Sequence, residues 1–251
     1  MEEKPHISLK ADKILEIFRI PITNSLLTVF IVLILFLILG INYFFESQKQ
    51  ARERNTVYYI FNFILKSLYQ FFYSVLGEET LKYFPVLASF FLFILLQNWF
   101  GLLPGVGSIL IKVVTHHKEH HFIPLLRGGT ADLNTTLALG ALSVIISNII
   151  SIQALGFKNY IARFYRIKEP ISFFIGTLEI VSEFSKMISF SFRLFGNIFA
   201  GKVLLGVIAF LIPVLVSFPF LMLELFVGFI QALVFAMLTC VFVSLGISKH
   251  H

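Results

Sequence analysis

Six charged side chains interrupt the apolar sequence between residues 171 and 246: Glu179, Glu183, Lys186, Arg193, Lys202 and Glu224. A charge inside a membrane helix is costly, because lipid does not solvate it, and such residues mark functional sites by default. Arg193 is the most informative of the six, since its guanidinium stays protonated in essentially any protein environment. A fixed positive charge at membrane depth, flanked by polar residues, suits a protein that handles a mobile charge.

The polar residues around Arg193 share one helical face. At about 100° per residue they fall within roughly 100° of arc: Glu179, Ser182, Glu183, Lys186, Arg193 and Asn197. Glu183 and Lys186 have the i,i+3 spacing of an ion pair. Arg193 has no acidic residue within one turn, so its anionic partner is Glu224 or a carboxylate on another chain. Glu224 and Gln231 share a face of the next helix, roughly 20° apart.

Structural roles compete with functional ones at these positions. The two glutamates of the polar face and Lys186 could form a static ionic cluster between helices. The amide and hydroxyl side chains could be ordinary interhelical hydrogen-bond partners. Lys202 lies off the polar face, and its long side chain is expected to extend toward a membrane interface. A purely structural Arg193 is the least favoured of these alternatives.

Three further patterns carry little weight. The segment GNIFAGKV, residues 196–203, nearly fits a phosphate-binding loop, but it lacks the final hydroxyl residue and does not follow a strand. The run HHKEHH, residues 116–121, favours a solvated loop over a metal site, because no cysteine accompanies it. Cys240 lies in an apolar run and is typical of a packing residue. We therefore expect no cofactor and no metal.

The composition shows what kind of fold must position these residues. Of the 251 residues 57% are hydrophobic and only 14% are charged, and 31 are phenylalanine. A soluble domain leaves about a quarter of its unfolded surface exposed, so it could not hide so much apolar surface. A soluble enzyme, a disordered chain and a nucleic-acid-binding module are excluded. Continuous apolar runs also exclude a transmembrane β-barrel, which leaves an all-α polytopic membrane protein.

The hydropathy pattern divides a single membrane domain into eight segments. They are an extracytoplasmic N-terminal segment (1–21), a first span (22–45), a cytoplasmic or interfacial segment (46–82), a second span (83–104), a polar extracytoplasmic loop (105–130), a third span (131–155), a basic cytoplasmic loop (156–170) and a long helical hairpin (171–246). The aromatic stretch within 46–82 is typical of an interfacial helix. The expected fold therefore has about five membrane helices plus an interfacial helix.

The hairpin is unusual in its length. Residues 171–212 contain no proline, and one helix over these 42 residues would extend about 63 Å at about 1.5 Å per residue. This is roughly twice the hydrocarbon thickness of about 30 Å, and an ordinary tilt of about 20° cannot absorb the difference. Pro213 and Pro219 indicate a turn, after which residues 220–246 are again apolar. We predict a hairpin of two long, strongly tilted helices.

The loop charges set the orientation. The segments 46–82 and 156–170 carry nine Lys or Arg residues together, against three in 105–130. The positive-inside rule places the first two segments in the cytoplasm. The N-terminus is then outside and the C-terminus inside. The N-terminal tail carries four basic residues, but four acidic residues accompany them.

Several segments resemble subunit a of the F-type rotary ATP synthase. The most specific is SFSFRLFGNIFAGKVLLGVI, which has the arginine, leucine, phenylalanine, glycine and asparagine of the family signature in order. LLQNWFGLLPG (95–105), ADLNTTLALG (131–140) and FIQALVFAMLT (229–239) resemble the family's second span, the start of the next and its last helix. The similarity covers most of residues 80–246, in the family's order.

This resemblance implies that the last two helices lie nearly horizontal against a ring of c subunits. Arg193 matches the arginine that interacts with each ring carboxylate and separates two offset half-channels. Asn197 and Gln231 match polar residues near it, and Glu179 matches an acid on the same helix, with Ser182, Glu183 and Lys186 nearby. Some members have an acid where this chain has Lys202, and a histidine where it has Glu224. We therefore favour Glu224 as the proton relay.

The resemblance also implies partners and a place in the cell. The chain would be a proton-translocating, non-catalytic stator subunit that couples ion flow to ring rotation and ATP synthesis. Its partners would be the c ring, the subunit b peripheral stalk, the other synthase subunits and membrane lipid, without nucleic acid. A bacterial inner membrane is expected, with a plastid form as the alternative. Rival functions are a secondary transporter, for which repeats and broken helices are not evident, and a membrane anchor, which would not need Arg193.

Overall fold

The computed structural model describes residues 11–17, 20–114, 120–158, 160, 170–211 and 217–247. Its helices are α1 (Asn24–Gln48), α2 (Thr56–Leu76), α3 (Thr80–Phe100), α4 (Leu133–Leu155), α6 (Pro170–Leu211) and α7 (Ser217–Ile247), with short 3-10 turns η1 (Ala51–Glu53), η2 (Gly77–Glu79) and η3 (Gly129–Ala131). Its strands are β1 (Lys13–Ile17), β2 (Ile20–Thr23), β3 (Leu110–Val114) and β4 (His120–Pro124).

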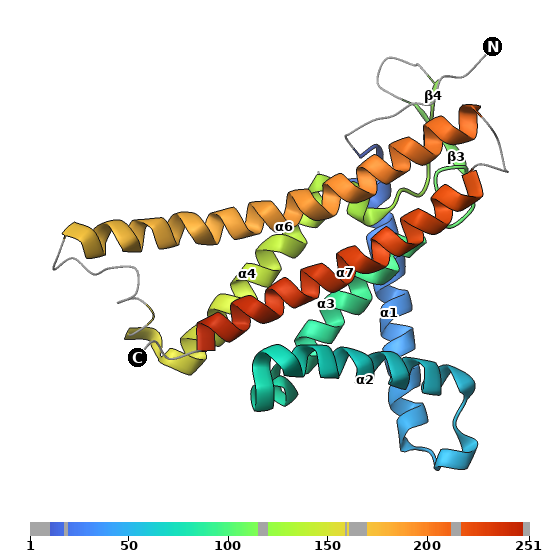
Figure 1. Ribbon diagram of the computed structural model, residues 1–251. Coiled ribbons are helices and arrows are strands. Elements are labelled where there is room, and N and C mark those ends of the chain that lie inside the picture. The colour runs from blue at the N-terminus through green and yellow to red at the C-terminus, as the bar shows by residue number, and fades with distance from the viewer. Residues whose placement is uncertain are drawn as a thin grey trace.

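Five helical segments of the described chain are long and apolar enough to cross a membrane. They are α1, the continuous α2–α3 segment, α4, α6 and α7. The predicted all-α polytopic membrane fold is confirmed. Figure 1 shows α2 running across the molecule near the lower end of α1 rather than beside it, as expected for a helix at a membrane interface.

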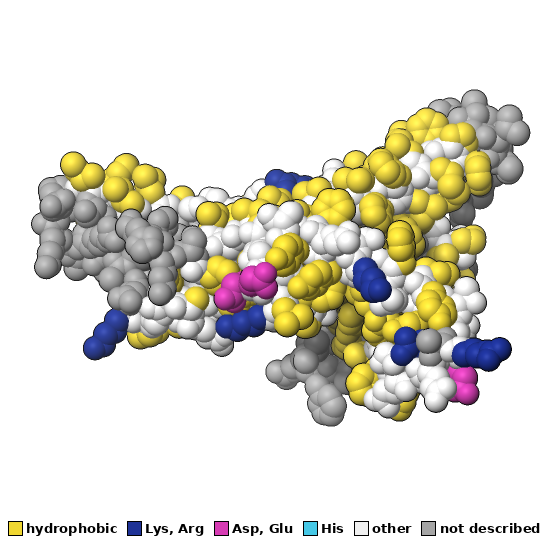
Figure 2. Space-filling model, turned by 60° about the horizontal axis from the view of Figure 1, so that its bottom comes forward, with side chains coloured by type: hydrophobic (Ala, Val, Ile, Leu, Met, Phe, Trp, Pro, Cys, Tyr) yellow, Lys and Arg dark blue, Asp and Glu magenta, His cyan; other side chains and the backbone are white. Residues whose placement is uncertain are grey.

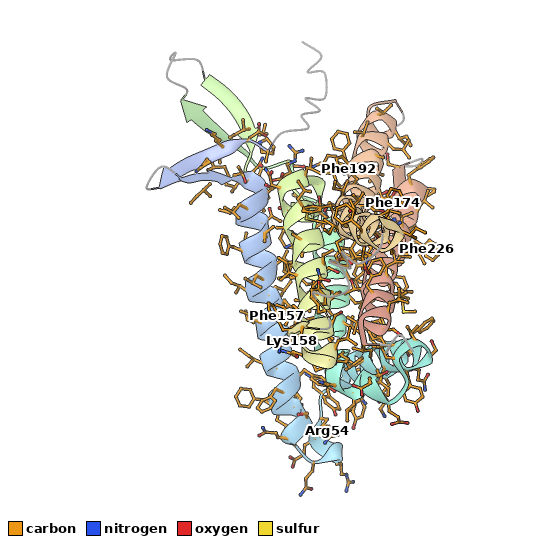
Figure 3. All side chains as sticks on the ribbon, turned by 90° about the vertical axis from the view of Figure 1, so that its left-hand side faces the viewer. Arg54, Phe157, Lys158, Phe174, Phe192 and Phe226 are labelled. Carbon is orange, nitrogen blue, oxygen red and sulfur yellow. The ribbon has the colours of Figure 1, made fainter. Side chains whose placement is uncertain are left out.

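The long hairpin is the dominant feature of the fold. α6 contains 42 residues and α7 contains 31, which correspond to about 63 and 46 Å at about 1.5 Å per residue. Figure 1 shows the two helices running in opposite directions, and Figure 3 shows α6 close to end-on where α1 is seen lengthwise. α6 is therefore strongly inclined to α1. This inclination resolves the mismatch between helix length and membrane thickness.

Proline placement in the hairpin differs from the sequence-based expectation. α7 begins at Ser217, so Pro219 lies in its first turn rather than in the preceding turn. The N–H groups of a helix's first turn have no intrahelical acceptor, and proline is tolerated there. Pro170 is likewise the first residue of α6.

Small residues let α4 pack tightly beneath the hairpin. Gly140 lies against Ser191 of α6, and Gly246 of α7 lies against Ser151. The hydroxyls of Ser143 and Thr239 are 2.8 Å apart. Small residues at membrane helix interfaces allow backbones to approach closely. The apolar core beside this seam is formed mainly by α3 and α7, and the Phe190 ring of α6 packs at a tilt against Phe235 and Phe242 of α7.

Two β-hairpins were not predicted from the sequence. β1 pairs with β2 and β3 pairs with β4, both antiparallel, and both hairpins lie at the upper end of the molecule in Figure 3. The strands are only four or five residues long, too short for the alternation of side chains to stand out from an apolar background. α3 ends at Phe100, so the polar loop starts before Pro104.

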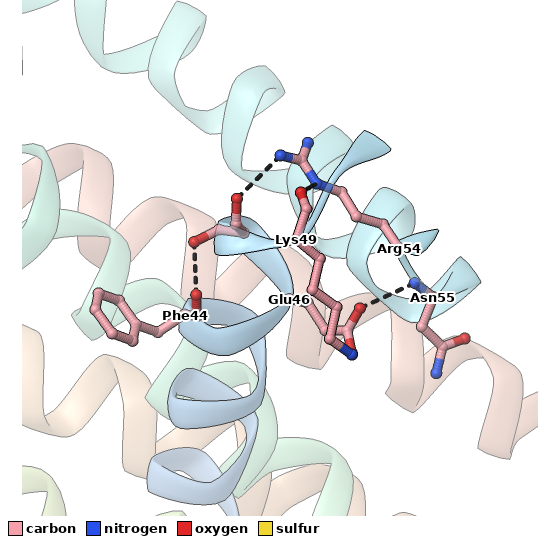
Figure 4. Close-up of polar contacts among 6 residues, drawn as sticks. Phe44, Glu46, Lys49, Arg54 and Asn55 are labelled. Atoms are coloured by element: carbon pink, nitrogen blue, oxygen red, sulfur yellow. Dashed lines mark hydrogen bonds and ion pairs between the residues drawn. The ribbon is translucent and has the colours of Figure 1, made fainter. Parts of the chain in front are cut away.

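The basic turn between α1 and α2 lies at the opposite end. Figure 3 places Arg54 at the lower tip, away from both β-hairpins. Arg54 donates through Nε to the Lys49 carbonyl at 3.0 Å, and its Nη2 donates to the Ser47 carbonyl at 2.9 Å (Figure 4). The Glu46 carboxylate accepts a hydrogen bond from the backbone N–H of Asn55 at 3.1 Å. The turn is therefore ordered by its own charged residues, although these bonds are exposed or only partly buried.

The outer surface is predominantly apolar. Large hydrophobic side chains are exposed along α1, α6 and α7. In Figure 2 one face carries mostly hydrophobic side chains, with a few charged groups set apart among them. A surface of this kind is stable in lipid or against another apolar protein, and not in water.

Candidate functional site

Two residues of the polar face predicted for α6, Lys186 and Asn197, contact α7. Lys186 pairs with Glu183 at 2.6 Å and its ammonium lies 4.6 Å from the centre of the Phe242 ring of α7. The predicted ion pair is therefore present. Glu179 and Ser182 lie one to two turns earlier on α6, where Glu179 is half-buried and Ser182 is exposed.

Arg193 lies further along α6 and is exposed. Its neighbours Leu194 and Ser191 are buried and Phe192 is exposed, so the guanidinium projects from the edge of an otherwise apolar face. Glu224 is not its partner: no ion pair involving Arg193 is found in the described part of the chain.

Asn197 and Gln231 form a hydrogen bond between α6 and α7 close to Arg193. Asn197 lies one turn after Arg193, and its Nδ2 donates to Gln231 Oε1 at 2.7 Å. Gln231 is buried on α7. The bond fixes the Gln231 amide with its nitrogen still available as a donor, and it holds α7 against α6 beside the guanidinium.

Glu224 is buried on the α6-facing side of α7, with 6% of its surface exposed. Its carboxylate lies against Gly201, so closely that a Cβ at that position would overlap both carboxylate oxygens. Glu224 Oε1 has no hydrogen-bond partner within the described residues. A buried carboxyl held in place by a glycine, with one oxygen unpaired, is suited to exchanging a proton with water.

Gly201 can be tested as the residue that makes room for Glu224. Gly201→Val is expected to destabilise the α6–α7 hairpin by about 1–3 kcal/mol, the usual cost of overpacking. Thermal unfolding of the purified protein in detergent measures this cost. Adding Glu224→Ala should restore most of the loss, because it removes the overlapping atoms. Gly40→Ala is the control, since a Cβ there meets nothing within 4 Å; equal destabilisation by both would refute the contact.

Residues of α3 that sequence reasoning had not assigned to the site also reach α7. Asn98 Nδ2 donates to the Gly228 carbonyl at 2.9 Å, and Trp99 Nε1 donates to the Leu225 carbonyl at 3.1 Å. Gly228 lies one turn after Glu224. Gln97 is fully buried beside Gly129 of η3. Two adjacent amide side chains inside an apolar span, Gln97 and Asn98, are the sequence signal that could have predicted this part of the site.

A polar network surrounds the start of α1 at the end that carries the β-hairpins. Ser25 Oγ donates to Asp132 Oδ2. The other carboxylate oxygen of Asp132 caps α4 by accepting from the backbone N–H of Asn134 at 3.0 Å. Asn24 Nδ2 donates to Asp12 Oδ2 at 3.3 Å and to the Pro124 carbonyl at 3.1 Å. The network joins the N-terminal segment, α1, the loop and α4.

Arg127 is buried at the centre of this region. Its backbone amide donates to Thr28 Oγ1 at 3.2 Å and its Nη2 donates to the Ala131 carbonyl at 3.2 Å. Burial lowers the pKa of the guanidinium, while the charges of Asp12 and Asp132 act in the opposite direction. The group nevertheless stays protonated at any physiological pH. Lys202 of α6 is exposed and interacts electrostatically with Arg127 and Asp12.

No group of three or more potential metal ligands is found among the described residues. His116 and His117 lie outside the residues that the structure describes. So do Arg163, Arg166 and Lys168 of the basic loop.

Comparisons with known proteins place this geometry in a family. A family model described as ATP synthase A chain matches residues 26–244. ATP synthase subunit a of Moorella thermoacetica is 29% identical over 238 residues, which are 94% of this chain and 97% of that protein. The subunit a of Syntrophobacter fumaroxidans is 33% identical over 192 residues, covering 76% and 72% of the two chains.

A relative from Propionigenium modestum is named ATP synthase subunit a, sodium ion specific. It is 33% identical over 232 residues, which cover 90% of this chain and 75% of the relative. The match with the family model spans α1 to α7, and so includes Arg193, Asn197, Glu224 and Gln231. This multi-pass membrane protein therefore belongs to the ATP synthase A chain family.

Proposed function

We propose that the chain conducts protons to and from the carboxylates of a rotating ring of small membrane subunits, as the stator of an F-type ATP synthase. The observation that carries the proposal is the exposed Arg193 on α6, a permanent cation without an ion-pair partner among the described residues. Such a cation at membrane depth needs a carboxylate from outside the chain. A ring that presents one carboxylate after another would supply it.

Polar groups lie on both sides of Arg193 along the hairpin. Toward the start of α6 are Glu179, Ser182 and the Glu183–Lys186 pair. In the other direction are the Asn197–Gln231 bond and the buried Glu224. We assign the first group to an inner half-channel, a polar path from the cytoplasm to the ring, and the second to an outer half-channel from the opposite side. Arg193 separates the two paths, because a ring carboxylate must release its proton to pass it.

The side assignments follow the loop charges. In Figure 3 the lower end of the molecule carries Arg54, and the β-hairpins lie at the upper end. By the positive-inside rule the Arg54 end faces the cytoplasm, with the N-terminus outside and the C-terminus inside. We place the chain in a bacterial inner membrane, with the peripheral stalk subunit b and the other synthase subunits as further partners. It performs no bond chemistry itself.

A secondary transporter with a midplane substrate site is the competing function. It would carry its own substrate site between repeats, and the family match over residues 26–244 does not favour it. A transporter would work without a ring of partner subunits, so the two functions differ in composition as well as in activity.

Purification from native membranes distinguishes these functions. A tagged chain extracted in mild detergent is expected to copurify with a small two-helix proteolipid that carries one membrane carboxylate per subunit. The purified assembly, reconstituted in vesicles, should acidify them when ATP is added, in buffer without sodium. A chain that purifies alone and transports a solute would overturn the proposal. Pumping that requires added sodium would show that the transported ion is sodium rather than the proton. The assignment of the chain as the stator subunit would then still stand.

A further inference from the structure

The last turn of α3 buries two amide side chains that the mechanism above leaves without a role. Gln97 and Asn98 are 0% and 1% exposed. Both amide atoms of Gln97, and Asn98 Oδ1, lack a hydrogen-bond partner in the described part of the chain. Buried polar side chains are almost always paired with protein or with ordered water. These amides therefore point to bound water.

A third such group lies next to Gln97. Gly129 of η3 packs against Gln97 Oε1 so closely that a Cβ would not fit. The following residue, Thr130, is fully buried, and its hydroxyl also has no partner among the described residues. η3 packs on α1, α3, α4 and α6 at once. Thr130 thus lies where four helices converge, and Gly129 before it contacts Gln97.

The inner end of this cluster is Glu224. Asn98 donates to the carbonyl of Gly228, one turn from Glu224 on the same face of α7. After Gln97, Asn98 and Thr130, Glu224 is the fourth of these residues with a buried polar atom, Oε1, that has no partner in the described chain. Unpaired acceptors and donors therefore continue from η3 through α3 to the proposed proton relay.

The outer end of the cluster is the network around Asp132. Thr130 is two residues before Asp132, which accepts from Ser25. The same network reaches Asp12, which is only half-buried. Packed elements thus link the half-buried Asp12 to Glu224: the Asp132 network, η3, the last turn of α3, and α7.

We propose that Gln97, Thr130 and Asn98 hold water molecules that form the deep section of the outer half-channel, between Asp132 and Glu224. This proposal rests on the proposed function and names the route by which protons reach Glu224. Gln97 is a positioning residue in it: its amide orients water by donating and accepting, and does not itself titrate. The elements beside the route are α1, α3, η3, α4 and α7 and, at Glu224, the Gly201 side of α6.

Two substitutions separate a wet path from a structural role. Gln97→Leu keeps the side-chain size and removes both polar atoms, so it should exclude water from this part of the path. ATP-driven proton pumping in inverted vesicles should fall about fivefold, the rate equivalent of one lost hydrogen bond. Gln97→Ala should slow pumping less than Gln97→Leu, because the space it leaves is polar at its edges and admits water. A purely structural Gln97 predicts the reverse order, since the alanine leaves the larger cavity.

Thiol labelling tests water access directly and does not depend on the rate. In a Cys240→Ala background, Gln97→Cys and Thr130→Cys should each react with methanethiosulfonate ethylammonium added from outside to right-side-out membranes. Inverted vesicles prepared from the labelled membranes should then pump at least about fivefold more slowly. Leu87→Cys is the matched control, because Leu87 lies on the same helix, is 1% exposed and belongs to the apolar core. It should stay unlabelled.

The outcomes are distinct. The water path is wrong if the thiol at position 97 is as unreactive as that at 87, or if Gln97→Ala slows pumping more than Gln97→Leu. The amount of ring copurified with each variant reports on assembly, and the labelling result decides for any variant that assembles poorly. Loss of pumping in Arg193→Ala together with normal pumping in Gln97→Leu would reject only the path. Normal pumping in Arg193→Ala would reject the proposed function instead.

Discussion

Arg193→Ala is expected to abolish ATP-driven proton pumping and ATP synthesis while the complex still assembles. Arg193 is exposed and forms no ion pair with another described residue, so its removal breaks no ion pair within the described chain. In the proposed function it also removes the charge that lets a ring carboxylate stay ionised as it passes between the half-channels. We expect both rates to fall at least about 100-fold, as on loss of a preorganised charge at a reaction centre.

Proton pumping in inverted vesicles and ring copurification are the measurements for Arg193. Arg193→Lys should also fail to support synthesis, because an ammonium loses its proton far more readily than a guanidinium in a low-dielectric site. Lys66→Ala, an exposed cation on α2, is the control and should pump normally. Pumping by Arg193→Ala within a few-fold of the unmodified protein would contradict the proposed function.

The proposed attraction between Arg193 and a ring carboxylate must also be weak enough for the carboxylate to leave. Moving one charge through the full membrane potential provides about 2.3 kcal/mol per 100 mV. An arginine–carboxylate pair in a low dielectric exceeds that energy and would trap the ring. The exposed Asn197 beside Arg193, and the buried amide of Gln231 that it contacts, keep the surroundings polar. We expect this polarity to weaken the pair enough for each carboxylate to leave.

Glu224→Gln is the second substitution with a large expected effect. The glutamine has the same shape and can occupy the space beside Gly201, but its amide does not exchange a proton at physiological pH. If Glu224 relays protons into the outer half-channel, ATP-driven pumping and synthesis should fall about 100-fold or more, the usual contribution of a positioned acid or base. The thermal unfolding of the complex should change little.

The matched control for Glu224 is Glu79→Gln, which neutralises an exposed carboxylate between α2 and α3. It should pump at the normal rate. Glu224→His should recover part of the activity, because imidazole titrates near neutral pH. If Glu224→Gln pumps as well as Glu79→Gln, the relay lies elsewhere, and Glu224 is a packing partner of Gly201.

Most of the fold followed from the sequence, because apolar composition and helix length act locally. The uninterrupted run from 171 to 212 could be one helix only if it were strongly inclined, and α6 is a single helix of 42 residues. The β-hairpins were missed, because they depend on pairing between short strands that have no marked alternation. The start of α7 at Ser217 also differs from the prediction, because proline usually marks a helix boundary whereas the first turn of a helix accepts it.

The sequence by itself determined that six polar residues of α6 share a face and that Arg193 has no acid within a turn. These conclusions need only the period of the helix. Only the tertiary structure decided which residues meet across elements: Glu224 with Gly201, Asn197 with Gln231, and Gln97 with η3. Such contacts depend on how helices cross, which no local pattern encodes. The charge in the membrane helix was thus predictable from the sequence, whereas the contacts between helices depend on the packing.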